Sequence, residues 1–240
     1  MPRANRYILP GNVCHLTHRC HNRSFLFKFA KDRTEYRKRL RAAVKEFKMG
    51  LLTYCITSNH VHLLVTAAAP ETISSFMQKL EGEFAEYYNI RKHRNGAFWQ
   101  GRYWCTMIDN GEYLWNCMRY IDLNMVRAGV VNHPSEWDWC GYRELVGDRK
   151  RYKFLDVEEV LNRYNKPNAD NFRDNYRQSI AEAIEKQQLN QEPIWTENIA
   201  VGSESFVRSI EKDKFNRSEL IVESSSVGCW SVRESEISYS

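Results

Sequence analysis

The sequence predicts an α+β fold in which helices cover one face of an antiparallel sheet. Short segments with alternating or continuous apolar residues, typical of strands, are separated by longer segments whose apolar residues recur at helical spacing. Their order is strand, helix, two adjacent strands, helix, strand and helix. Helices that alternate with strands and a hairpin in this way favour an antiparallel sheet with helices packed against it.

The first strand is predicted over Val13 to Cys20, where small or apolar residues alternate with polar ones. An irregular basic loop, Asn22 to Lys28, follows it. Asp32 is placed to cap a helix that ends at Gly50. The apolar stripe of this helix consists of Tyr36, Leu40, Ala43, Val44 and Phe47. The stripe would pack on the sheet, with Lys and Arg on the opposite side.

The next two strands are predicted to form an antiparallel hairpin. They cover Leu51 to Thr57 and His60 to Thr66, and the short turn Ser58-Asn59 joins them. The second long helix begins at Pro70 and ends near His93 to Gly96. Its apolar stripe consists of Ile73, Phe76, Met77, Leu80, Phe84 and Tyr87.

The aromatic and basic segment Ala97 to Ile108 predicts the fourth strand. A third helix is expected from Asp109 to about Asn124. The whole order corresponds to the ferredoxin-like pattern.

Composition predicts an ordinary globular protein of one or two domains, since 42% of the 240 residues are hydrophobic and 13% are aromatic. The seven cysteines are odd in number and contain no Cys-x-x-Cys pair, which favours a reducing compartment over a disulfide framework. Residues 1–10 lack the apolar core of a signal peptide, and no apolar run approaches the ~18 residues of a membrane span. We therefore expect a cytoplasmic protein with no membrane partner.

The net charge of +5 is unevenly distributed. Residues 1–153 contain 25 Lys and Arg against 14 Asp and Glu, and residues 154–240 contain 10 against 16. We predict a basic domain over 1–153 and an acidic, mainly helical extension over 154–240, with a poorly ordered tail rich in serine and glutamate. The basic domain suggests a nucleic-acid partner, although surplus basic residues also occur simply to solvate a surface.

Two histidines lie one residue apart in the third predicted strand. Because side chains alternate along a strand, His60 and His62 share one face, and Val61, Leu63 and Val65 share the other. Two adjacent imidazoles on a rigid strand are well suited to bind a divalent cation. A pair of surface histidines without a ligand is the alternative for this pattern taken alone.

The third helix supplies polar groups at helical spacing. Tyr120 and Asn124 are four residues apart and share one helix face, which Arg127 continues. An amide oxygen is a suitable ligand for Mg²⁺ or Mn²⁺, and a tyrosine near such an ion can attack phosphorus. Taken singly, Tyr120 also fits a residue at the edge of the core, and Asn124 a helix C-terminus.

These segments carry a family resemblance. The motif NHVHLLV, the later motif YIDLNMVRAGVV and the stretch HPSEW closely resemble the single-tyrosine HUH transposases, and specifically the REP-associated tyrosine transposases of bacteria. The resemblance spans roughly Tyr7 to Val146, and the region Gly202 to Val207 resembles longer members more weakly. It departs at Met125, where the family often has proline.

The resemblance implies a site and a reaction. His60, His62 and Asn124 would bind Mg²⁺ or Mn²⁺, and Tyr120 would be the nucleophile. The implied reaction cleaves single-stranded DNA at palindromic REP hairpins through a 5′-phosphotyrosine bond and leaves a free 3′-OH. Residues 1–153 would then be the catalytic domain. The family includes both dimers and proteins regarded as monomers, so the oligomeric state stays open.

DNA contacts are predicted around the first and fourth strands and beside the tyrosine. Cationic groups at these places would bind phosphates, and aromatic rings would stack on unpaired bases. The candidates are Arg19, Asn22, Arg23, Arg102, Tyr103, Trp104 and Arg127. The histidines and cysteine near the first strand (His15, His18, Cys20 and His21) fit no common zinc-binding spacing, so we assign no zinc site to them.

Two further functions are compatible with the same fold. A domesticated hairpin-binding protein would keep the basic surface with little or no cleavage, and a replication-initiation or RNA-binding protein would reuse the sheet. The intact His60, His62 and Tyr120 favour the transposase, because DNA binding alone requires none of them.

Overall fold

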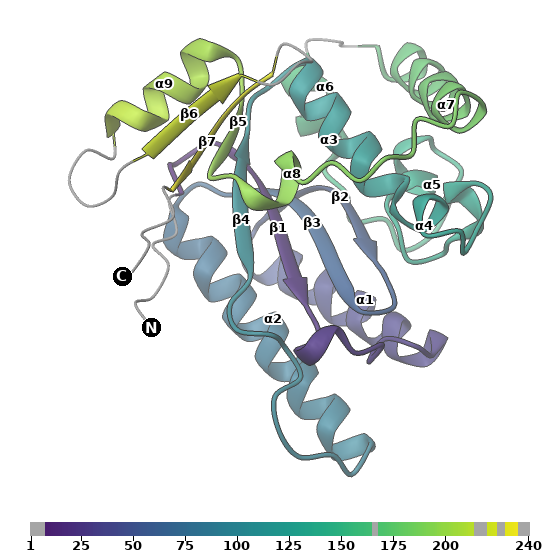
Figure 1. Ribbon diagram of the computed structural model, residues 1–240. Coiled ribbons are helices and arrows are strands. Elements are labelled where there is room, and N and C mark those ends of the chain that lie inside the picture. The colour runs from purple at the N-terminus through teal and green to yellow at the C-terminus, as the bar shows by residue number, and fades with distance from the viewer. Residues whose placement is uncertain (1–7, 165–167, 214–219, 225–228, 235–240) are drawn as a thin grey trace.

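A seven-stranded sheet forms the centre of the protein (Figure 1). The computed structural model describes residues 8–164, 168–213, 220–224 and 229–234. The strand order is β2-β3-β1-β4-β5-β7-β6. The strands are β1 (Val13–Arg19), β2 (Gly50–Ile56), β3 (His60–Thr66), β4 (Trp104–Ile108), β5 (Ala200–Gly202), β6 (Leu220–Ser224) and β7 (Trp230–Glu234). The predicted α+β class is confirmed.

Helices pack on both faces of this sheet, which corrects the expectation of one covered face. The helices are α1 (Ala30–Glu46), α2 (Pro70–Arg91), α3 (Glu112–Asp122), α4 (Asn124–Arg127), α5 (Tyr142–Leu145), α6 (Val157–Tyr164), α7 (Ala169–Glu185), α8 (Ile194–Glu197) and α9 (Glu204–Asp213), with 3-10 turns η1 (His21–Arg23) and η2 (Pro134–Glu136). On β3, Leu63 joins the core under α1 and α2, while its neighbour Leu64 joins the core under α3 and α7. Both faces of β3 therefore carry apolar side chains at this level, and both require cover.

The register of β1 and β3 brings polar residues that are distant in the sequence together. β3 is antiparallel to both β2 and β1, which confirms the predicted hairpin. Thr17 lies opposite His62, and Arg19 lies opposite His60. Residues at the start of β3 therefore meet the end of β1.

The structure changes three predicted boundaries. Asp32 does not cap α1; Phe29 precedes the helix, and Asp32 is buried in an ion pair with Arg91 of α2. β4 begins only at Trp104, because the preceding chain turns at Gly101, whose φ is 65°. The third helix ends at Asp122, and Leu123 separates it from α4.

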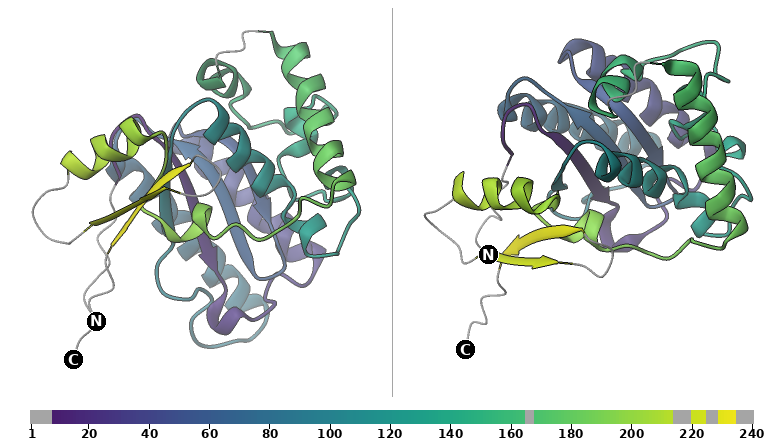
Figure 2. Two further views of the ribbon diagram at one scale, coloured as in Figure 1. Left: turned by 45° about the horizontal axis from the view of Figure 1, so that its top comes forward. Right: turned by 90° about the horizontal axis from the view of Figure 1, so that it is seen from above.

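The chain after residue 153 contributes to both the second core and the sheet. The Tyr176 hydroxyl of α7 donates a hydrogen bond of 2.8 Å to Asp122 of α3. β5 pairs in parallel with β4, and β7 and β6 extend the sheet further, with α9 beside them (Figure 2). The division at residue 153 stays a prediction. Parts of the expected tail, residues 225–228 and 235–240, lie outside the described residues.

Over the ranges that the structure describes, no helix has both the length and the apolar character needed to cross a membrane.

Candidate active site

His60 and His62 project from the same face of β3, as their spacing predicts. Their ring centroids are 4.7 Å apart. His62 is only 2% exposed, and Leu64, two residues further along the same face, belongs to the core under α3. The two imidazoles are therefore held by a central strand at the boundary between the core and an open cavity.

Hydrogen bonds orient the His60 ring. Its Nδ1 lies 2.6 Å from the Asn59 side-chain oxygen and 3.0 Å from the Thr57 hydroxyl. The Thr57 hydroxyl donates its own hydrogen to the His60 carbonyl at 2.8 Å. His60 Nδ1 must then carry a proton, so the lone pair of the ring is on Nε2.

Asn124 and Tyr120 approach the same pair from the helical side. The Asn124 amide nitrogen lies 3.0 Å from His62 Nε2. The Tyr120 ring stands edge-on to the His62 ring, with centroids 5.9 Å apart. Although Leu123 interrupts the helix, one residue from each side of the break contacts His62. The structure thus brings together the four residues predicted as ligands and nucleophile.

Arg127 packs against the tyrosine. Its guanidinium lies 4.5 Å from the centroid of the Tyr120 ring and donates a hydrogen bond of 3.3 Å to the Tyr120 carbonyl. Its Nε donates to the carbonyls of Leu189 and Asn190 at 3.1 and 3.0 Å. These bonds tie the tyrosine-bearing segment to the chain that precedes α8.

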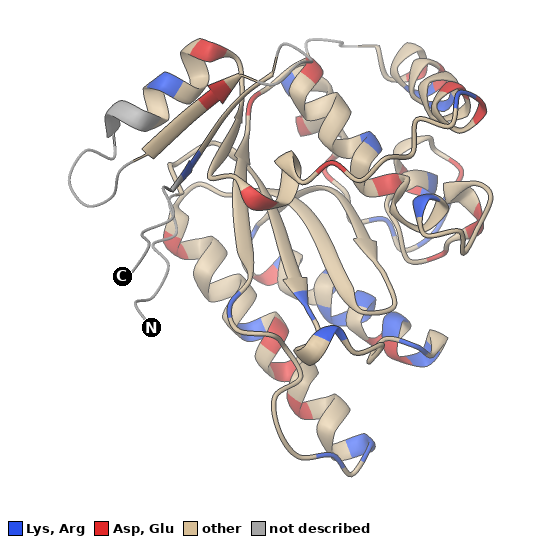
Figure 3. Ribbon diagram, viewed as in Figure 1, with Lys and Arg blue, Asp and Glu red and all other residues tan. Residues whose placement is uncertain are grey.

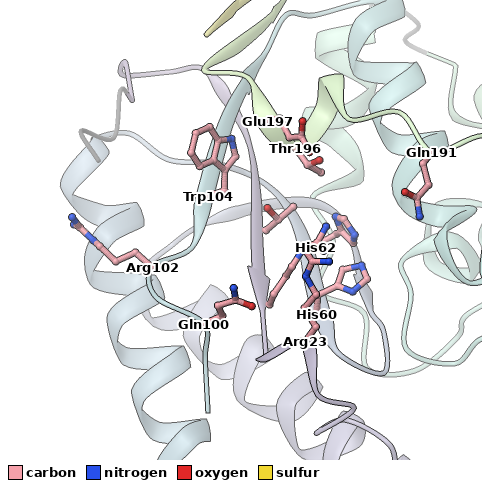
Figure 4. A pocket seen from close by; sticks show the side chains of 11 residues that line it. Arg23, His60, His62, Gln100, Arg102, Trp104, Gln191, Thr196 and Glu197 are labelled. Atoms are coloured by element: carbon pink, nitrogen blue, oxygen red, sulfur yellow. The ribbon is translucent and has the colours of Figure 1, made fainter. Parts of the chain in front are cut away.

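A cavity of about 450 Å³ opens in front of the two histidines (Figure 4). Four of the residues predicted to contact DNA line it, namely Arg19, Arg23, Arg102 and Trp104. The sequence-based prediction missed the other lining residues, which are Thr17, Gln100, Gln191, Thr196 and Glu197. Those after residue 190 lie well beyond both motifs in the sequence, and no local pattern marks them.

The remaining candidates lie elsewhere. Asn22 is exposed in η1 with a left-handed φ of 52°. Tyr103 is buried in the core under α1 and α2. Tyr120 and Arg127 line a neighbouring cavity with Glu192 and Trp195 instead. DNA contacts by Asn22, Tyr103 and Arg127 stay predictions that this geometry favours less.

The cavity is basic at one end and its imidazoles are uncharged. Lys and Arg gather around the end of β1, the loop after it and α1 (Figure 3). Burial, helped by the nearby Arg19 and His15, lowers the pKa of His60 to about 3. Burial likewise lowers the pKa of His62 well below its usual range. Both rings are neutral near pH 7, which is the form that binds metals.

Burial has the opposite effect on the tyrosine. It raises the pKa of the Tyr120 hydroxyl above its usual value, and the charge of Arg127 partly offsets this effect. Any activation of this phenol must therefore come from cationic groups close to it.

The arrangement of a histidine pair on a central strand facing a tyrosine on a helix agrees with a known family. Residues 11–124 match the model of the family described as "Transposase IS200 like". This segment is similar to IS200-like transposases. The matched segment extends from just before β1 to Asn124 and so includes all four site residues.

Comparisons with individual proteins agree with this transposase family. A protein of Haemophilus influenzae described as a "Putative REP-associated tyrosine transposase" is 26% identical over 129 residues, which are 47% of this chain and 72% of that protein. A solved structure of a REP-associated tyrosine transposase bound to a REP hairpin superposes with a TM-score of 0.53 at 20% identity. It covers 65% of this chain and 93% of the solved one, and supports the fold. The resemblance recognised in the sequence is confirmed.

The donor set around His62 fits a divalent cation. Among the described residues, no group of three or more His, Cys, Asp and Glu side chains could hold a metal ion. The Asn124 amide reaches His62 Nε2, and rotation of that amide exchanges its nitrogen and oxygen. Two imidazoles and one amide oxygen suit Mn²⁺, and oxygens of water or phosphate would complete the shell for Mg²⁺ as well.

Proposed function

We propose that the protein is a metal-dependent single-stranded DNA endonuclease and strand transferase that acts on REP-type palindromic hairpins. The observation that carries this proposal is the convergence on His62, which contacts both the Asn124 amide at 3.0 Å and the edge of the Tyr120 ring. The three residues come from a strand and two helices, and a protein that only binds DNA has no need to assemble them.

His60, His62 and Asn124 would hold Mg²⁺ or Mn²⁺. When bound, the ion would polarise a phosphate oxygen and stabilise the negative charge on the phosphate oxygens in the transition state. The neutral imidazoles favour this role, since no proton has to leave either ring near pH 7.

Tyr120 would attack the phosphorus of the scissile bond. Its phenolic oxygen forms a bond to phosphorus, its proton is lost, and the bond from phosphorus to the 3′ oxygen breaks. The 3′ oxygen takes up a proton and leaves as a 3′-OH, while the 5′ end stays attached as a phosphotyrosine. Attack of a 3′-OH on this bond would reverse the step or join a new strand.

The cavity in front of the histidines supports single-stranded DNA as the substrate. Arg19, Arg23 and Arg102 supply positive charge, and Trp104 is 39% exposed and offers a ring face for stacking. The solved relative bound to a REP hairpin supports a hairpin as the form in which the strand is presented.

A test uses a labelled hairpin oligonucleotide of REP type incubated with Mn²⁺. We expect a covalent protein–DNA adduct on a denaturing gel with the wild-type protein and none with Tyr120→Phe. Tyr113→Phe is the matched control, since Tyr113 lies in the same helix and outside the proposed ligand and nucleophile set. Tight binding without an adduct across a panel of REP hairpins would favour the hairpin-binding protein and overturn the enzyme.

A further inference from the structure

His15 is a buried histidine of β1 for which the proposed reaction has no direct use. It is fully buried and projects toward His62. The two rings stack with centroids 5.1 Å apart and an interplanar angle of 19°. His15 Nε2 lies 2.9 Å from His62 Nδ1, and His15 Nδ1 lies 2.8 Å from the main-chain carbonyl of Trp195 in α8. A carbonyl, His15 and His62 thus form one hydrogen-bonded chain.

The carbonyl fixes the direction of every hydrogen in this chain. A carbonyl oxygen only accepts, so His15 Nδ1 carries the proton. In a neutral imidazole the other nitrogen then bears the lone pair, so His15 Nε2 accepts from His62 Nδ1. With its proton on Nδ1, His62 presents its lone pair at Nε2, the atom that faces Asn124.

The reverse arrangement is disfavoured at both contacts. If His62 carried its proton on Nε2, its Nδ1 lone pair would require a proton on His15 Nε2. His15 Nδ1 would then be a lone pair 2.8 Å from the Trp195 oxygen, which would place two acceptors in contact inside the core. A doubly protonated His15 would place a charge at a fully buried position whose two bonding partners are both uncharged groups.

The Trp195 carbonyl is itself held in place by packing and hydrogen bonds. The Trp195 side chain is 3% exposed, and its Nε1 donates to Glu192 at 2.7 Å. At the end of α8, the carbonyl of Asn198 accepts from Thr106 of β4 at 2.7 Å, and the Asn198 amide donates to the Ile194 carbonyl at 3.0 Å. These contacts seat α8 on the sheet, so its carbonyl is aimed at His15 by the fold.

We infer that His15 is a positioning residue that fixes the tautomer of His62. The carbonyl of Trp195 sets the direction of the hydrogen bonds in the chain formed by this carbonyl, His15 and His62, which we call the relay. The ligand role of His62 in the inference rests on the proposed function. Trp195 lies beyond the matched transposase segment, residues 11–124. The chain after residue 153 therefore contributes a group that prepares the metal-binding atom.

The first test records the tautomer directly. In protein labelled with ¹⁵N-histidine, without metal or DNA, long-range ¹H–¹⁵N spectra distinguish a protonated Nδ1 from a protonated Nε2, and loss of signals in His62→Gln assigns the ring. We expect His62 to be protonated on Nδ1. A His62 ring protonated on Nε2 in the wild-type protein would overturn the inference, and this result requires no variant of His15 to fold.

The second test changes the relay. His15→Leu removes the acceptor, and we expect His62 to populate both tautomers and Mn²⁺ affinity, measured by electron paramagnetic resonance, to fall about 10- to 100-fold. His15→Gln places an amide oxygen near the former Nε2, and we expect it to restore the Nδ1 tautomer and bring the affinity to within about threefold of wild type. His18→Leu changes a buried histidine on the opposite face of β1 and is expected to leave the His62 tautomer unchanged.

The outcomes separate the relay from the proposed function. An unchanged tautomer and affinity in His15→Leu would overturn the relay. A wild-type protein with His62 protonated on Nδ1 that binds no Mn²⁺ and forms no DNA adduct would overturn the proposed function and leave the relay intact.

Discussion

The guanidinium of Arg127 lies 4.5 Å from the centroid of the Tyr120 ring and is bonded to main-chain carbonyls on two sides. Arg127 thereby connects the proposed nucleophile to the chain that leads into α8. The sequence predicts that Arg127 contacts a phosphate, whereas its position indicates that it holds Tyr120 in place. The two roles predict different results in solution.

We expect Arg127→Gln to slow adduct formation about tenfold, because the cation next to the Tyr120 ring and its carbonyl bonds are both lost. The dependence of DNA affinity on salt concentration should stay as in the wild type, since the Arg127 guanidinium is already hydrogen-bonded to main-chain carbonyls of the protein. The control is Arg119→Gln. Arg119 lies in α3 and lines the same neighbouring cavity as Tyr120 and Arg127. A decrease of about 0.7 to 0.9 in the slope of log affinity against log salt concentration for Arg127→Gln would show instead that it contacts a phosphate.

The cavity arginines should show the opposite behaviour. We expect Arg19→Gln and Arg102→Gln each to reduce that slope by about 0.7 to 0.9, because each removes one phosphate contact. Binding of a single-stranded oligonucleotide measured by fluorescence anisotropy at several salt concentrations gives the slope. Arg163→Gln is the matched control, since Arg163 is paired with Glu159 away from this cavity. Equal slopes for wild type and both cavity variants would remove these arginines from the DNA interface.

The buried carboxyl group of Asp122 is expected to make the free energy of unfolding depend on pH. It is buried between Thr53 and Tyr176, which donate hydrogen bonds of 2.9 and 2.8 Å, and burial raises its pKa from 3.8 to about 7. A pKa raised in the folded state means that the folded protein binds the proton more tightly. The stabilisation is therefore complete below about pH 4 and is lost as the pH rises toward 7.

Asp122→Asn removes this titration. We expect the free energy of unfolding of the variant, relative to wild type, to shift in its favour by about 2–4 kcal/mol between pH 4 and pH 8. Urea unfolding at several pH values measures this difference. A difference that does not vary with pH would show that Asp122 ionises normally in the folded protein.

Local patterns predicted the part of the site that lies within single elements. Alternation along one strand placed His60 and His62 together, and four-residue spacing placed Asn124 next to Tyr120. The contact of His15 with His62 depends on the register of β1 and β3, and that of His15 with Trp195 joins residues 180 positions apart. No periodicity within a segment encodes either contact.

The same limit applies to the fold. The helices of the first 124 residues have long apolar stripes, whereas β5 is only 3 residues long and gives no recognisable alternation. The second covered face was missed because Leu52 and Leu64 have the pattern of ordinary strand residues, and only the fold shows that they share a core with residues of α3, α6 and α7. The cytoplasmic location stays a prediction.

Asn124 offers the most direct test of the metal site. Replacement by Asp keeps the position of the side chain and exchanges a neutral amide oxygen for a carboxylate, a stronger ligand for hard cations. We expect Asn124→Asp to bind Mn²⁺ more tightly than wild type, and Asn124→Leu to bind it about tenfold more weakly.

Asn116, an asparagine of α3 that lines the neighbouring cavity with Tyr120, provides the control in the form of Asn116→Asp. Its added charge is similar, so it separates ligation from a general electrostatic effect. Isothermal titration with Mn²⁺ measures all variants in the absence of DNA. If Asn116→Asp raised the Mn²⁺ affinity as much as Asn124→Asp, the gain would come from the added negative charge. This result would contradict the assignment of Asn124 as the third ligand.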